Sequence, residues 1–104
     1  MKRNMLNSLL IEGLVKGELE LLQVGEEKKT RFTITNYCLG QYNDLTIIGD
    51  RKLYDRIADG LLVRAVGNIQ SDADGRMCVN ATFVEFKKPN KWDLGVPENP
   101  CEDE

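Results

Sequence analysis

The sequence predicts a small all-β domain of five strands, with one short helix between the third and fourth strands. Several segments alternate apolar and polar residues, which is the period of a half-buried strand, and turn residues separate these segments. One charged segment between two of the strands has helical spacing instead. A chain of 104 residues is long enough for one domain with a modest core.

The first two strands are predicted on either side of a glycine-containing turn. Residues 7–22 form one long strand that can coil at its glycines, and residues 23–28 form the turn. Residues 29–35 have the cleanest alternation in the chain, which turns Phe32 and Ile34 inward. The next segment, residues 36–43, is predicted to be a hairpin loop.

The third strand is predicted at residues 44–49, and the charged residues 50–59 that follow are predicted to be helical. The apolar residues with helical spacing in this segment are Leu53, Ile57 and Ala58. Gly60 stands where the C-terminus of a helix favours a left-handed residue.

The fourth strand is predicted at residues 60–69 and the fifth at residues 76–86, with a turn at residues 71–75 between them. The apolar alternation changes phase within the fifth strand, because Val79, Ala81 and Phe83 match one face whereas Val84 and Phe86 match the other. A bulge would explain this change. We therefore expect one domain at residues 1–88 and a short acidic, flexible tail at residues 89–104.

The order strand, strand, strand, helix, strand, strand is that of an OB-fold, a five-stranded Greek-key barrel.

The charge of the chain is unevenly distributed. Five of the 17 acidic residues lie in the last twelve positions, which contain no basic residue. The rest of the chain therefore has 12 acidic and 14 basic residues and carries a small net positive charge. A mildly basic body suits an anionic ligand, although an ordinary mixed surface would give the same tally.

Several classes of function are excluded or disfavoured by composition. The chain has no histidine, which excludes Ser-His and Cys-His catalysis and histidine-ligated metals. The cysteines Cys38, Cys78 and Cys101 form no C-x-x-C pair and are expected to be reduced thiols. No apolar stretch has the length of a membrane span or the form of a signal peptide. We expect a cytoplasmic protein that is not an enzyme and uses no metal or cofactor.

Five segments also resemble, in the same order and with the same glycine positions, the strand motifs of one protein family. The segments are Asn7–Val15, similar to N-x-V-x-L-x-G-x-L; Arg31–Thr35, similar to R-F-x-I-A; Leu45–Gly49 followed by Leu53, similar to V-x-V-x-G entering a helix; Gly60–Ile69, similar to K-G-x-x-V-x-V-x-G-x-L; and Asp74–Arg76 leading into Val84–Phe86, similar to the final strand. From Asn7 to Phe86 the sequence thereby resembles the bacterial single-stranded DNA-binding proteins (SSB).

The resemblance implies an oligomeric OB-fold that binds single-stranded DNA with little sequence preference, in DNA replication, repair or recombination. Tyr42 lies closest to the place of one base-stacking aromatic of the family, and Ile48 stands in the place of a second. Where the family has a long tail with an acidic tip that recruits replication and repair enzymes, this chain has a short acidic end without a final phenylalanine.

Single strands are bound by stacking bases on aromatic rings and by contacts from cations to phosphates. The candidate residues for this binding, on outward faces or loops, are Lys16, Arg31, Tyr37, Tyr42, Thr46, Ile48, Arg64 and Arg76. Since few aromatic residues are available, salt-dependent phosphate contacts would carry more of the affinity. Alternatively, the tyrosines cover a loop, Arg31 and Arg64 form cross-strand ion pairs, and Ile48 contacts another subunit.

Two alternatives to an SSB-like function stay open at this point. One is a primosomal accessory protein of the PriB type, which binds DNA and a helicase. The other is an OB-fold scaffold that makes only protein–protein contacts. In each case exposed strand edges on a small barrel favour a homodimer or homotetramer.

Overall fold

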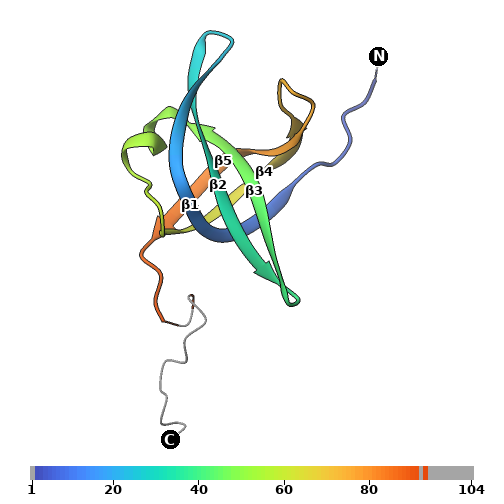
Figure 1. Cartoon of the computed structure of the whole chain (residues 1–104). Helices are drawn as coiled ribbons and strands as arrows, with labels where there is room; N and C mark the ends of the chain where they lie inside the picture. Colours follow the sequence, from blue (N-terminus) through green and yellow to red (C-terminus); the bar gives the residue numbers. More distant parts are fainter. Residues whose placement is uncertain (1, 92, 94–104) are drawn as a thin grey trace, which may run out of the picture.

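The computed structural model describes residues 2–91 and residue 93, and within them the chain forms a five-stranded barrel. Residues 92 and 94–104, which make up most of the predicted tail at 89–104, therefore lie outside the described residues. The elements are β1 (Leu9–Val24), β2 (Glu27–Cys38), β3 (Gln41–Asp50), the 3-10 helix η1 (Arg51–Asp55), β4 (Leu62–Ser71) and β5 (Met77–Lys87). The strands close in the order β1-β2-β3-β5-β4, as Figure 1 shows. This topology is the OB-fold, so the predicted fold class is confirmed.

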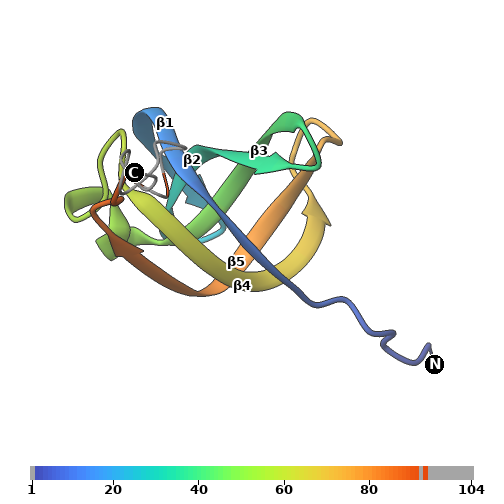
Figure 2. The same cartoon turned by 90° about the horizontal axis from the view of Figure 1, so that it is seen from below.

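The long first strand joins the two halves of the barrel. Its first part, from Leu9 to Leu14, pairs with β4, and its second part pairs with β2. The register with β2 shifts between Lys16 and Glu20, where Gly17 has a φ of 82°. This irregularity lets β1 curve around the barrel, as predicted for a strand that coils at its glycines, and Figure 2 shows the curve from below.

The core fills the barrel from all five strands and from η1. Phe32 and Ile34 point inward from β2, as the alternation predicted, and both are almost fully buried. The other buried members are Val15, Ile47, Leu53, Ile57, Val63, Ala65 and Val79. The outward side chains of Arg31, Thr33 and Thr35 on β2 are only partly exposed because neighbouring strands flank them.

The helical segment is shorter than the sequence predicted. η1 is a single 3-10 helix, and the carboxylate of Asp50 caps it by accepting a hydrogen bond of 2.8 Å from the Lys52 backbone N–H. Leu53 and Ile57 are buried as expected, whereas Ala58 is exposed. The chain leaves the helix early because it must return to β1, where the Gly60 N–H donates to the Val15 carbonyl at 2.8 Å.

β5 contains the predicted bulge. Its register with β4 shifts between Val66, opposite Phe83, and Gly67, opposite Ala81, so Thr82 is the extra residue. The shift turns Phe83 outward, with 56% of its surface exposed, while Val84 packs against the core. The sequence placed Phe83 on the same face as Val79 and Ala81, and this was wrong because the bulge comes one residue earlier than Phe83.

Three further observations concern only residues 2–91 and 93. No helix there is both long and apolar enough to cross a membrane. No group of three or more potential metal ligands comes together in this part of the chain. Cys38 at the end of β2 and Cys78 on β5 are free thiols, the first exposed and the second buried.

Candidate nucleic-acid interface

The outward side chains of β1, β2 and β3 form one continuous surface, here called the front face. It consists of Lys16, Glu20, Arg31, Thr33, Thr35, Asp44, Thr46 and Ile48. Register places Lys16 opposite Thr33 and Thr33 opposite Thr46, which makes one row across three strands. A second row runs from Glu20 through Arg31 to Ile48. Four of the eight predicted site residues, Lys16, Arg31, Thr46 and Ile48, are therefore neighbours on this face.

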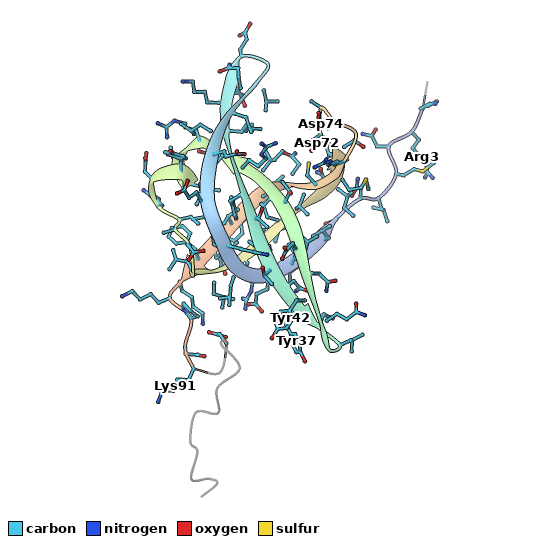
Figure 3. All side chains as sticks on the ribbon, viewed as in Figure 1. Arg3, Tyr37, Tyr42, Asp72, Asp74 and Lys91 are labelled. Atoms are coloured by element: carbon cyan, nitrogen blue, oxygen red, sulfur yellow. The ribbon has the colours of Figure 1, made fainter. Side chains whose placement is uncertain are left out.

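The two predicted tyrosines lie at the tip of the β2–β3 hairpin, at one end of the front face. Tyr37 and Tyr42 are direct cross-strand partners, and their ring centroids are 4.9 Å apart with an interplanar angle of 51°. Both rings remain accessible, with 63% and 76% of their surfaces exposed. Figure 3 shows the pair projecting from the end of the hairpin. The arrangement leaves ring surface available for a stacked base.

The hairpin itself differs from the predicted loop at residues 36–43. Its strands continue to Cys38 and resume at Gln41, so the turn contains only Leu39 and Gly40. Both residues have positive φ, 51° and 82°, which is the pattern of a type I′ turn that suits the twist of a hairpin. The tyrosines consequently stand on paired strands, whose backbone hydrogen bonds fix their positions.

Each cation of the front face is paired with a carboxylate. The Arg31 Nε donates to Glu20 Oε1 at 2.7 Å, and the Lys16 Nζ donates to Asp44 Oδ2 at 2.8 Å. Thr35 adds a hydrogen bond of 2.9 Å to Asp44. The hydrogen bonds from Lys16 and then Thr35 hold the pKa of Asp44 below its usual value. The face is therefore a mixed-charge surface, on which phosphates would compete with Glu20 and Asp44 for the cations.

Arg64 lies on another surface, the outward face of β1, β4 and β5. Its Nη2 donates to Glu12 at 3.0 Å, and a second contact of 3.9 Å joins it to Glu85. Glu12 and Glu85 are its neighbours on the two adjacent strands. The structure thus separates Arg64 from the other candidates. Arg64 forms the cross-strand ion pairs that were the predicted alternative to a role in DNA binding.

Arg76 directly precedes β5, at the end of the β4–β5 turn. Its backbone N–H donates to the Asp72 carboxylate at 2.9 Å, and the Asp74 N–H donates to the same oxygen at 2.9 Å. Within the described part of the chain, the Arg76 side chain makes no ion pair. Figure 3 shows this turn, marked by Asp72 and Asp74, at the opposite end of the molecule from the tyrosines.

Glu20 and Asp44, which determine the charge of the front face, were not predicted as site residues from the sequence. The signal that could have revealed Asp44 is the length of the β2–β3 turn. Once the turn is limited to two residues, strand register places Asp44 opposite Thr35. Glu20 was harder to place, because the register shift in β1 lies between Lys16 and Glu20.

Comparison with known proteins supports the fold. No family model matches the sequence, and no curated protein matches it. Among solved structures, the chain is similar to the dimeric N-terminal domain of PriB from Thermoanaerobacter tencongensis, with a TM-score of 0.69 and 20% identity over 80% of this chain and 98% of that one. It is also similar to the second single-stranded DNA-binding protein (SSBb) of Mycobacterium smegmatis, with a TM-score of 0.65 and 17% identity over 76% of this chain and 86% of that one.

A third similar structure is the Plasmodium falciparum SSB in complex with single-stranded DNA. The TM-score is 0.60 and the identity is 14%, over 83% of this chain and 96% of that one. The OB-fold that the SSB resemblance implied is thus confirmed.

Proposed function

We propose that this protein binds single-stranded DNA without catalysis and largely independently of sequence, in DNA replication, repair or recombination. The observation that carries the proposal is the exposed pair Tyr37 and Tyr42, held on paired strands at the end of the front face. The proposal is supported by the shared fold with SSB proteins, one of which was solved in complex with single-stranded DNA.

In the proposed complex, unpaired bases stack on the tyrosines and the strand continues over the front face. Ile48 offers an apolar contact, and the hydroxyl of Thr46 can donate to a base or a phosphate. Lys16 and Arg31 contact phosphates by exchanging their carboxylate partners. Base stacking is tolerant of sequence because every base has a π-face.

Binding to a fluorescein-labelled oligothymidine, followed by anisotropy at increasing salt, tests this proposal. We expect binding at low salt that weakens as salt rises. The slope of log K against log salt should be about −1.4, because each phosphate contact on a single strand contributes about −0.7 and the front face has two cations, Lys16 and Arg31. A duplex of the same length is the control and should bind more weakly. Absence of oligothymidine binding at low salt would instead favour the scaffold that makes only protein contacts.

Replacing Asp44 by asparagine should strengthen binding. The change releases Lys16 from its ion pair and removes one negative charge from the front face. Since an exposed ion pair is worth up to about 1 kcal/mol, we expect oligothymidine affinity to rise about threefold to fivefold at low salt and little at high salt. Asp55→Asn is the matched control, because it removes the Arg51 pair on η1, away from the front face. Equal effects of the two variants would contradict the proposed path.

We also propose that the protein is a homo-oligomer that associates through the outward face of β1, β4 and β5. Leu10, Val66 and Phe83 form one apolar row across these strands, and Leu10 is 65% exposed. The dimeric state of the similar PriB domain supports the proposal. Sedimentation of a Leu10→Glu variant should show dissociation to smaller species, whereas Val24→Glu, at the far end of β1, should sediment as wild type. An unchanged mass for Leu10→Glu would refute this interface.

A further inference from the structure

Beyond Asn80, one backbone edge of β5 has no strand partner. β5 pairs with β4 from Met77 to Lys87, but it pairs with β3 only at Val79 and Asn80. β3 ends at Asp50, where the chain turns into η1, so η1 lies beside β5 instead of a strand. Every second residue on this edge therefore directs its N–H and C=O groups away from β4, without a partner in the described barrel.

A groove separates this edge from η1, with a volume of about 250 Å³. Leu53 and Val84 line it and lie close together, because both are within contact distance of the position that a Cβ on Gly49 would occupy. Phe86 continues the apolar lining along β5. The groove combines an apolar floor with an open strand edge, and Figure 1 shows that η1, in green, lies far from the β2–β3 hairpin.

The charge of the groove is positive. Lys52 and Arg56 line it from η1 and the residue that follows, and neither makes an ion pair within the described residues. Its one acidic residue, Asp50, has its carboxylate engaged with the Lys52 backbone N–H. Lys87 and Lys88 follow Phe86 in sequence, and they too lack ion pairs in this part of the chain. This differs from the front face, where the cations are neutralised.

We propose that this groove binds an extended acidic segment of a partner protein, which adds to the open edge of β5 as a further strand. The backbone of the segment would pair with β5, and alternate side chains would divide between the apolar floor and Lys52 and Arg56. A nucleic-acid strand would satisfy the cations but has no regular series of donors and acceptors to pair with a strand edge. The site is separate from the proposed DNA-binding surface.

The test uses a fluorescein-labelled peptide of eight residues that alternates glutamate and valine. Anisotropy should show that it binds the full chain, and that Lys52→Glu/Arg56→Glu weakens this binding at least about tenfold. Lys28→Glu, near the start of β2, is the control for charge alone and should weaken binding less than about twofold. Because backbone pairing is essential, a peptide N-methylated at every residue, which blocks the N–H groups on both of its edges, should bind poorly.

Amide chemical shifts locate the peptide independently. Addition of the peptide should perturb residues 81–87 and η1 and leave Tyr37 and Tyr42 unchanged. Equal binding of the methylated peptide, or equal binding to the charge-reversed protein, would overturn the proposal. It would also be overturned if oligothymidine perturbed residues 81–87 and displaced the peptide, since the groove would then be a nucleic-acid site. The peptide measurements contain no DNA, so their outcome is independent of the proposed DNA binding.

Discussion

A protein in which Tyr37 and Tyr42 are both replaced by alanine should bind oligothymidine about 10- to 100-fold more weakly than wild type. A base stacked on an aromatic ring is worth about 1–3 kcal/mol, and the two rings form the main aromatic surface next to the front face. Because the paired cations of this face attract phosphates only weakly, stacking should carry a large share of the affinity. Anisotropy titrations at a single low salt concentration measure the difference.

Three controls separate loss of stacking from loss of structure. Tyr37→Phe/Tyr42→Phe should bind almost as wild type, since stacking requires the ring and not the hydroxyl. Tyr54→Ala removes an exposed tyrosine of η1 and should have no effect. The double alanine variant should keep its cooperative unfolding, because both rings are mainly exposed. Wild-type affinity of the double alanine variant would exclude the hairpin tip from the binding path.

The barrel was predictable because its strands have one buried and one exposed face. In β2 the alternation around Phe32 and Ile34 identifies the core side without any other information. The bulge in β5 was also visible as a change of phase, although its position was not. A bulge inserts one residue between two partners, and only the pairing of Gly67 with Ala81 identifies Thr82 as that residue.

The candidate site was less predictable, because its properties depend on pairs of residues distant in sequence. Lys16 and Asp44 are 28 positions apart, and their contact follows from the register of three strands. A hairpin was predicted at residues 36–43, but the two-residue length of its turn was not, because Leu39 adopts a positive φ that its side chain does not favour and the sequence lacks the usual Asn-Gly signal. The tyrosines were therefore predicted in a loop, where their mutual contact could not be inferred.

Replacing Gly67 by alanine should destabilise the whole barrel by more than about 3 kcal/mol. An added Cβ at this position would lie 2.2 Å from the Asn80 carbonyl oxygen and 2.8 Å from the Ala81 Cα, both of which are backbone atoms of β5. Overpacking usually costs about 1–3 kcal/mol, and here no flexible side chain can move aside. For a domain of this size, the midpoint of thermal unfolding should fall by more than about 12 °C. Urea unfolding measures the free energy directly.

Gly25→Ala is the matched control, because Gly25 has a φ of 63° and no atom within 4 Å of the added Cβ. Its cost is conformational strain alone, about 1–2 kcal/mol. Similar unfolding free energies for the two variants would show that β5 can move away from β4 at the bulge. The larger loss expected for Gly67→Ala follows from the bulge itself, which presses the β5 backbone onto Gly67 where Thr82 is inserted. The same insertion turns Phe83 outward and Val84 toward the core, so the bulge sets the alternation of side chains along the rest of β5.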